Sequence, residues 1–199
     1  WSVGPSGPRY ALVVRPGREI ESRIEDTYLG LPGITRPTMG YHITLLGPFV
    51  LAPGVPAETL ELVSAVCARW RPFEVQLGGL GAFNNEGINT VYLGVVDCDA
   101  LWSLHTDLLE ALGGRIQFTS EQYRYWNTVR YEPHVTLSLG LTERALEDVL
   151  EMNQLCRQKL EFWVEAVWLV VENRVGAWQF VAEHPLGRGW SATAALNGC

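Results

Sequence analysis

The segment YHITLLGPF, residues 41–49, decides the fold of this 199-residue chain, because a related segment, PHVTLSLG, follows at residues 133–140. Both segments contain the tetrapeptide His-x-Thr-Leu, which begins at His42 in the first and at His134 in the second. The chain has only four histidines, so half of them occur in this pattern. Leucine and β-branched residues surround both tetrapeptides, and this composition predicts a strand at each.

The two tetrapeptides occupy equivalent places in a repeated order of elements. After each of them, the hydrophobic periodicity predicts one helix and then two strands. The expected segments are residues 57–70, 73–83 and 90–96 after the first tetrapeptide, and residues 142–156, 162–166 and 177–183 after the second. This internal duplication predicts two pseudo-symmetric lobes whose equivalent strands face each other across a cleft.

The remaining segments complete this organisation. Residues 9–16 predict a buried strand and residues 18–29 a short amphipathic helix. A further helix is expected over residues 99–113, with Asp99 as its N-cap, and Thr142 is the expected N-cap of the helix that it begins. We also expect a long surface loop over residues 115–131, a hairpin that turns at residues 173–176, a single two-lobed domain over residues 1–186 and a flexible tail over residues 187–199.

Successive side chains of a strand point to opposite faces, so His42 and Thr44 share one face, as do His134 and Thr136. The apolar residues between them can then be buried, while the histidines and threonines line a cleft. One imidazole can accept a proton while the other donates one near neutral pH. Threonine hydroxyls can hold phosphate oxygens, so the two pairs can bracket a phosphodiester without a metal ion. The alternative is that both are core histidines hydrogen-bonded to neighbours, and that the threonines only reflect β propensity.

The two motifs resemble the HxTx signature of the 2H phosphoesterase superfamily and are most similar to its 2′-5′ RNA ligase-like (LigT-like) branch. The resemblance extends over residues 9–185 in motif order and element pattern. It implies an α+β fold in which antiparallel sheets line a central groove and helices lie outside. It also implies a metal-independent enzyme without cofactors, in which His42 and His134 are the catalytic pair and Thr44 and Thr136 bind the phosphate. Members of the superfamily act on 2′,3′-cyclic phosphates, ADP-ribose cyclic phosphates or 2′-5′ linkages.

Additional substrate contacts are expected from aromatic and basic residues near the motifs. The expected loop at 115–131 leads into the second motif, and its aromatic rings could stack on a base while its arginines meet a phosphate. An equally weighted alternative is that this loop packs its own aromatic rings on the sheet edge. The candidate substrate-binding residues are Tyr41, Phe49, Tyr123, Arg124, Tyr125, Trp126 and Arg130.

Composition limits the partners. The net charge is −7, which disfavours a long duplex nucleic acid because such binding depends on many Lys and Arg contacts. No apolar run is long enough for a membrane span. The four cysteines form no C-x-x-C pair and indicate a reducing, cytoplasmic environment without a disulfide framework. We expect a monomer with no metal site, small buried thiols at Cys67 and Cys156, a partly buried or surface histidine at His105, and a structural or exposed histidine at His184.

Together with the two motifs, the resemblance to the 2H superfamily implies a hydrolase that opens 2′,3′-cyclic phosphates at RNA ends, as in RNA processing, or in small nucleotides. We assign His134 as the base that activates water and His42 as the acid on the leaving oxygen, although the sequence does not decide the order. Two alternatives stay open. The chain could be a 2′-5′ phosphodiesterase or RNA ligase or an ADP-ribose cyclic phosphodiesterase, or it could be a non-catalytic module that binds nucleotides or RNA ends.

Overall fold

The computed structural model describes residues 7–85, 88–96, 98–152 and 160–187, and this part of the chain forms one nine-stranded sheet. The sheet order is β7-β3-β4-β6-β2-β1-β8-β9, and β5 pairs with β2 beside this path. All of the pairings are antiparallel. The strands are β1 (Arg9–Val14), β2 (Ile43–Leu51), β3 (Phe73–Asn85), β4 (Ile88–Val96), β5 (Ile116–Phe118), β6 (His134–Leu141), β7 (Leu160–Val164), β8 (Ala166–Arg174) and β9 (Ala177–Pro185).

The two motif strands, β2 and β6, are direct neighbours in the middle of the sheet. Ile43 pairs with Val135, so the central residues of the two motifs lie opposite each other. Strands β3 and β4, which follow the first motif, extend the sheet beyond β6, whereas β8 and β9, which follow the second, extend it beyond β1. The two-lobed α+β prediction is confirmed, but the motif strands lie side by side and do not face each other across a cleft.

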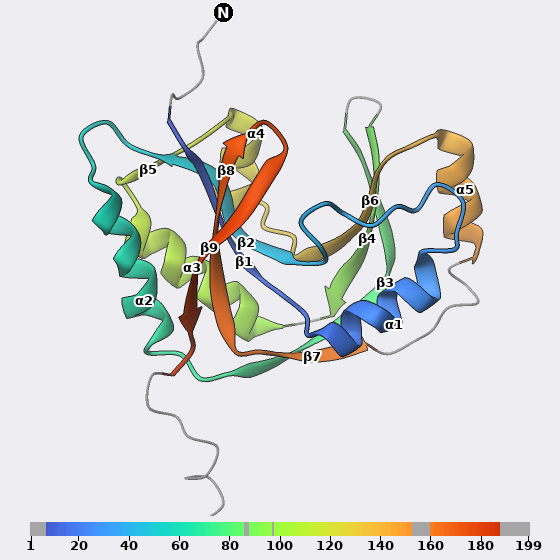
Figure 1. Cartoon of the computed structure of the whole chain (residues 1–199), viewed down its shortest axis with the longest axis horizontal. Coiled ribbons are helices and arrows are strands. Elements are labelled where there is room, and N and C mark those ends of the chain that lie inside the picture. Colours follow the sequence, from blue (N-terminus) through green and yellow to red (C-terminus); the bar gives the residue numbers. More distant parts are fainter. Residues whose placement is uncertain (1–6, 86–87, 97, 153–159, 188–199) are drawn as a thin grey trace, which may run out of the picture.

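Helices cover the outside of the curled sheet, with a separate pair for each lobe (Figure 1). Helix α2 and helix α3 contact each other and pack against β9 and β2, respectively. In the other lobe, α1 contacts β7, and α5 contacts β3, β4 and β6. The helices are α1 (Arg18–Tyr28), the 3₁₀ helix η1 (Ala57–Glu61), α2 (Leu62–Cys67), α3 (Asp99–Leu112), α4 (Glu121–Thr128) and α5 (Glu143–Met152).

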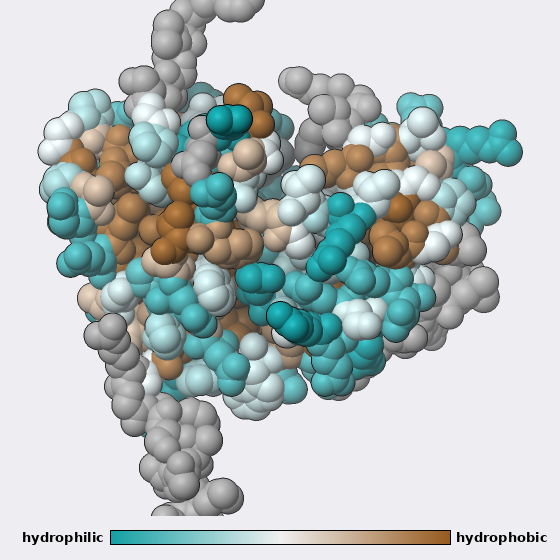
Figure 2. Space-filling model, in the orientation of Figure 1, coloured by the Kyte–Doolittle hydropathy of each residue, from teal (hydrophilic) through white to brown (hydrophobic). Residues whose placement is uncertain are grey.

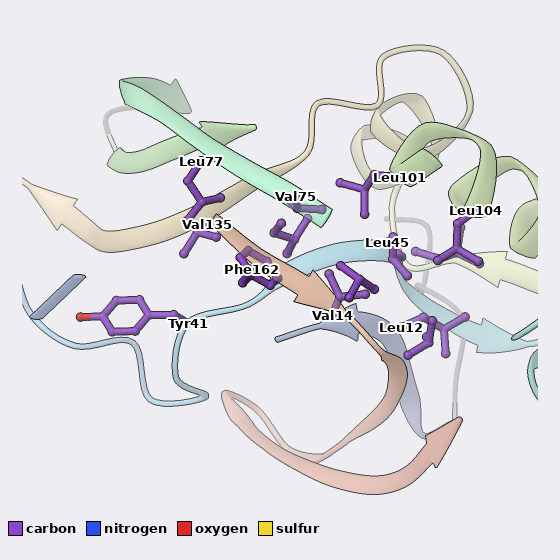
Figure 3. Close-up of a cluster of buried hydrophobic side chains, with 14 of the residues drawn as sticks. Leu12, Val14, Tyr41, Leu45, Val75, Leu77, Leu101, Leu104, Val135 and Phe162 are labelled. Atoms are coloured by element: carbon purple, nitrogen blue, oxygen red, sulfur yellow. The ribbon is translucent and has the colours of Figure 1, made fainter. Parts of the chain in front are cut away.

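The main core lies between the sheet and these helices. It contains Ile43 and Leu45 of the first motif strand and Val135 and Leu137 of the second, all fully buried. Figure 3 shows Leu45 and Val135 in one cluster with side chains from β1, β3, β7 and α3. Burial of these apolar side chains stabilises the position of both motif strands, because leaving the core would return a large apolar area to water. The alternate residues of both strands consequently point to the opposite, concave face.

The structure corrects three details of the predicted elements. Residues 115–131 are not a loop, because they contain β5 and α4, and the Ser120 hydroxyl caps α4 by accepting a hydrogen bond from the Tyr123 N–H (3.2 Å). Asp99 is the first residue of α3 and not its N-cap, which is Cys98. Strands β8 and β9 form the expected hairpin, but β7 leaves it and pairs with β3.

The predicted cap of α5 is confirmed, and two other expectations concern residues that the structure does not describe. The Thr142 hydroxyl accepts a hydrogen bond from the Ala145 N–H (3.2 Å) and caps α5 as predicted. Cys156, which ends the expected helix, lies outside the described residues, as do residues 188–199 of the expected tail. None of the described helices combines the length and the hydropathy that crossing a membrane requires. Figure 2 shows hydrophobic residues dispersed among hydrophilic ones on the face in view.

Candidate active site

The four motif residues meet on the concave face at the centre of the sheet. His42, Thr44, His134 and Thr136 are half-buried and alternate with fully buried apolar residues, as expected for strands with one face in the core. Continuing the register on either side of the Ile43–Val135 pair places His42 opposite Thr136, and Thr44 opposite His134. Each histidine therefore lies beside the threonine of the other motif, an arrangement that could surround one phosphate group.

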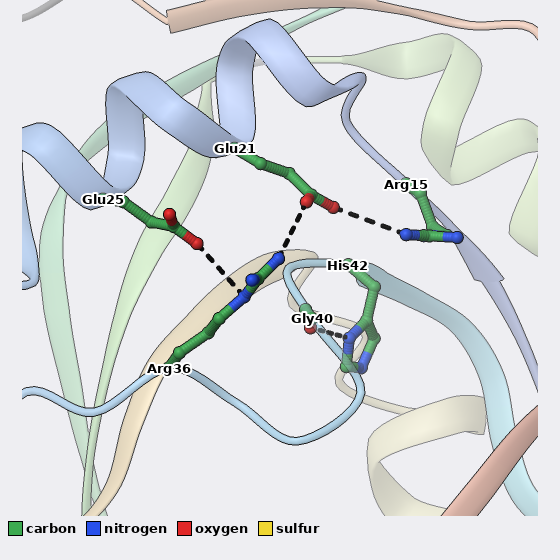
Figure 4. A network of polar contacts seen from close by, with 6 residues as sticks. All are labelled: Arg15, Glu21, Glu25, Arg36, Gly40 and His42. Atoms are coloured by element: carbon green, nitrogen blue, oxygen red, sulfur yellow. Dashed lines mark hydrogen bonds and ion pairs between the residues drawn. The ribbon is translucent and has the colours of Figure 1, made fainter.

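Both imidazole rings are oriented in the same way. The His42 Nδ1 is 2.9 Å from the carbonyl oxygen of Gly40 (Figure 4), and the His134 Nδ1 is 2.7 Å from that of Glu132. In both cases the partner stands two residues before the histidine. A carbonyl can only accept, so Nδ1 must carry the proton and donate it, which leaves Nε2 of the neutral ring as the basic atom.

The electrostatic surroundings of the two rings differ. Burial lowers the pKa of His42, and His134 and the guanidinium of Arg15 lower it further, although its bond to Gly40 opposes them. Burial also lowers the pKa of His134, but its bond to the Glu132 carbonyl and the nearby Glu132 carboxylate oppose this effect. Because His134 lowers the pKa of His42 and like charges disfavour each other, the state in which both rings are positively charged is disfavoured.

Aromatic side chains surround His134. Phe83 and Tyr92 are stacked with ring centroids 4.2 Å apart, and each centroid is 5.0 Å from that of His134. The Tyr92 hydroxyl donates a hydrogen bond to the Glu132 carboxylate (3.1 Å). Gly81 lies directly under the Tyr92 ring, where a Cβ atom would collide with it. This side of the site therefore offers an aromatic surface that ends in a hydroxyl and a carboxylate.

A cavity of about 360 Å³ lies next to this aromatic surface. Its lining includes Gly81, Tyr92 and Glu132, together with Gly94, which pairs with His134. The segment GGLGAF, residues 78–83, forms part of β3, and the β3–β4 register shifts between Leu77 and Leu80.

A buried network fixes the backbone of the first motif. The Tyr131 hydroxyl donates to the carbonyl oxygen of Thr44 (3.0 Å), and the ring of Tyr131 stacks on His105 with centroids 3.8 Å apart. The two ring nitrogens of His105 lie 2.6 Å and 3.0 Å from the carbonyl oxygens of Leu45 and Asn127. His105 is thus a buried structural residue, more enclosed than the sequence suggested. It joins α3 and α4 to β2 immediately behind the candidate site.

The chain matches the model of the 2′-5′ RNA ligase superfamily over residues 29–176. The chain belongs to the 2′-5′ RNA ligase superfamily. Its fold is that of TT0787 from Thermus thermophilus, with a TM-score of 0.63 and 19% identity, and of apo LigT from E. coli, with a TM-score of 0.61 and 19% identity. Both alignments cover 92% of this chain and 100% of the other. A search of curated proteins finds no match.

Two of the additional substrate contacts predicted for this superfamily member are wrong. Tyr41 is 1% exposed and Phe49 is 0% exposed, and both belong to the main core. Phe49 also packs against Tyr10, with centroids 6.0 Å apart. Their rings lie on the buried face of the chain, so they are inaccessible to a ligand in the groove.

The other five candidates lie on α4 or just after it. Tyr123 and Trp126 contact each other edge to face, with centroids 5.7 Å apart. Arg124 pairs with Glu121 and lines a depression of about 840 Å³ between α3, β5 and α4, distinct from the cavity beside His134. Tyr125 is exposed. Arg130 contacts the candidate site: its guanidinium is 3.6 Å from the Glu132 carboxylate.

The sequence interpretation missed several residues around the motifs. Arg15 directly follows β1, and its charge acts on His42. Glu132 and Tyr92 flank His134, and the position of Glu132 two residues before the motif histidine was the signal that could have identified it. Among the described residues, no group of three or more His, Cys, Asp or Glu side chains forms a potential metal site.

Proposed function

We propose that this chain is a phosphodiesterase that hydrolyses 2′,3′-cyclic phosphates at RNA ends or in small nucleotides, without a metal ion. The observation that carries the proposal is the matched orientation of His42 and His134, each with Nδ1 bonded to a backbone carbonyl and Nε2 left for chemistry. Binding alone would not require two histidines that both direct Nε2 to proton transfer, whereas acid–base catalysis does.

The reaction needs one neutral and one protonated histidine. The neutral ring removes a proton from water, and the oxygen of that water attacks the phosphorus. The bond from phosphorus to the ribose 2′ or 3′ oxygen breaks, and the protonated ring delivers its proton to that oxygen. The hydroxyls of Thr44 and Thr136 donate hydrogen bonds to the non-bridging oxygens, where negative charge grows in the transition state.

The charges around the site favour His42 as the base and His134 as the acid. Arg15 favours the neutral form of His42, and the Glu132 carboxylate favours the protonated form of His134. This assignment is the reverse of the one expected from the sequence. In a ligating direction the two roles would exchange.

The comparisons support a nucleotide substrate. The E. coli LigT structures include complexes with 3′-AMP, ATP and phosphate. A second candidate activity is cleavage or formation of a 2′-5′ linkage, which the description of the matching family favours. The same pair of histidines would serve either reaction, so only a comparison of substrates separates them.

The test is turnover of a panel containing 2′,3′-cyclic nucleotides, a short RNA with a terminal cyclic phosphate, a 2′-5′-linked dinucleotide and ADP-ribose cyclic phosphate. It is run with a chelator for the wild type, His42→Ala and His134→Ala. We expect cyclic phosphate opening that both substitutions abolish. Turnover of only the 2′-5′ dinucleotide would replace the first candidate with the second. Binding without any turnover would indicate a non-catalytic nucleotide-binding module.

A further inference from the structure

The concave face continues beyond the first motif across β1, β8 and β9. Thr44 pairs with Val13 of β1, and Val13 pairs with Trp168 of β8. Directly paired residues share a face, so Trp168 lies on the same side of the sheet as Thr44, about 10 Å away at the usual strand spacing. Phe180 of β9 pairs with Val170 and joins the same surface.

Aromatic rings cover this part of the concave face. Trp168 and Phe180 meet edge to face, with centroids 5.7 Å apart and ring planes at 90°. They are half-buried and pack over Val13 and Val170, which are completely buried beneath them. The surface therefore presents partly exposed aromatic rings to the same side as the motif residues.

A cation lies against these rings. The guanidinium of Arg15 is 4.4 Å from the ring centroid of Phe180 and 5.8 Å from that of Trp168. Its Nε is buried without a hydrogen-bond partner. Its terminal nitrogen is 3.5 Å from one oxygen of Glu21, a carboxylate whose other oxygen is 3.1 Å from Arg36 (Figure 4). Arg15 thus has a loosely bound and shared counter-ion, which leaves capacity for an additional anion.

The site accordingly has two separate aromatic walls. Phe83 and Tyr92 stand beside His134, whereas Trp168 and Phe180 stand on the side of Thr44 and His42, together with Arg15. A mononucleotide has a single base and can occupy only one wall. Stacking of a base on an aromatic ring and pairing of its phosphate with arginine are the usual contacts of single-stranded nucleic acid.

We propose that Arg15, Trp168 and Phe180 form a subsite for a second nucleotide, in which a base packs against the Trp168–Phe180 pair and the adjoining phosphate binds Arg15. The terminal nucleoside occupies the Phe83–Tyr92 wall. This inference rests on the proposed function and extends it: the substrate is the end of an oligonucleotide and not a free cyclic mononucleotide. The competing explanation is that the rings only cover Val13 and Val170, in which case they would not discriminate between substrates.

The test compares adenosine 2′,3′-cyclic phosphate with the dinucleotide ApA that ends in the same cyclic phosphate. The measured quantity is the ratio of kcat/KM for the dinucleotide to that for the mononucleotide. Phe180→Leu and Arg15→Gln are compared with two controls. Val181→Ala alters an exposed neighbour on β9, and Arg18→Gln removes the same charge from an exposed position at the start of α1.

We expect a ratio of about ten for the wild type and both controls, because stacking of one base is worth a factor of roughly 5 to 150. In Phe180→Leu and in Arg15→Gln the ratio falls toward one. A wild-type ratio near one overturns the inference. So does a ratio that both variants leave unchanged, because rings that only stabilise the fold would affect both substrates equally.

Equilibrium binding separates this inference from the proposed function. The affinities of 3′-AMP and of the 3′-phosphorylated dinucleotide ApAp are measured by tryptophan fluorescence for the same proteins. If the wild type hydrolyses neither cyclic substrate, the proposed function fails, but about tenfold tighter binding of ApAp that is lost in Phe180→Leu still supports the subsite. Equal affinity of the wild type for the two ligands rejects it, whether or not hydrolysis is observed.

Discussion

Asn127→Ala removes a buried amide that joins α4 to the first motif strand. The side-chain oxygen of Asn127 accepts a hydrogen bond from the Gly47 N–H (2.9 Å), and its amide nitrogen donates to the carbonyl oxygens of Gly47 (3.0 Å) and Tyr123 (2.7 Å). Gly47 has a φ of 126°, and a Cβ at this residue would lie 2.8 Å from the Cβ of Ala11. Only glycine therefore fits at residue 47, so no side chain there can replace the amide of Asn127.

The expected cost follows from the groups that lose a partner. Alanine leaves the N–H and the carbonyl of Gly47 buried and unpaired, and each such group costs about 1–3 kcal/mol. The carbonyl of Tyr123 is only partly buried, so water can replace its bond. The free energy of unfolding should therefore fall by about 4 kcal/mol, a large share of the stability of an ordinary domain.

Urea unfolding monitored by circular dichroism measures this change, with the midpoint and the slope fitted separately. Thr128→Ala is the matched control, because it truncates an exposed side chain on the same helix that donates only to the Arg124 carbonyl. The control should change stability by less than about 0.5 kcal/mol. A loss below about 1 kcal/mol for Asn127→Ala would mean that α4 does not hold β2 through this amide.

Three further predictions concern the site and the histidines. Thr136→Val keeps the shape of the side chain but removes a hydrogen-bond donor to the phosphate. In steady-state assays kcat should therefore fall about 100-fold, while the circular dichroism spectrum stays unchanged. An unaltered kcat would exclude this role of Thr136. Glu132→Gln removes the carboxylate that raises the pKa of His134, so its NMR titration should move to lower pH, and an upward shift would contradict the acid role. Burial lowers the pKa of His184, as it does for the other three histidines, so these residues bind protons at a higher pH in the unfolded chain than in the folded one. The free energy of unfolding should therefore decrease as the pH falls below about 6.5. Urea titrations between pH 8 and 5.5 check this, and His184→Gln should flatten the dependence.

The parts of the site that depend on local order could be predicted from sequence. His42 and Thr44 lie on one face because any strand alternates its side chains, and the apolar residue between them is buried because the core requires it. The duplicated tetrapeptide also indicated the pseudo-symmetry. What the pattern could not specify is which strands become neighbours, and the direct pairing of Ile43 with Val135 depends on contacts between distant parts of the chain.

The error over residues 115–131 has a similar origin. Helix α4 has only eight residues, and a helix of this length is marginal without tertiary support. The support comes from Asn127, whose partner Gly47 is 80 residues away in the sequence. Periodicity within the segment does not record this contact, so polar and aromatic residues that pack against β2 and β5 had the composition of a surface loop.

The duplication predicts the geometry of the two motifs but not the difference between them. Gly94 of β4 pairs with His134, and the corresponding place beside His42 falls to Arg15, since Val14 pairs with Ile43 and Arg15 follows it. The chain therefore has a cation on one side of its pseudo-symmetry axis, where the other side has a glycine and the nearby Glu132 carboxylate. Equal histidines in unequal fields can divide the tasks of base and acid. The same inequality leaves Arg15 against Trp168 and Phe180, which lie near the other end of the sequence and reach it only through the pairing of β1 with β8 and of β8 with β9. Under the proposed function, the repeated motif would supply the acid and the base, whereas their assignment and the choice of substrate would depend on residues that the repeat does not contain.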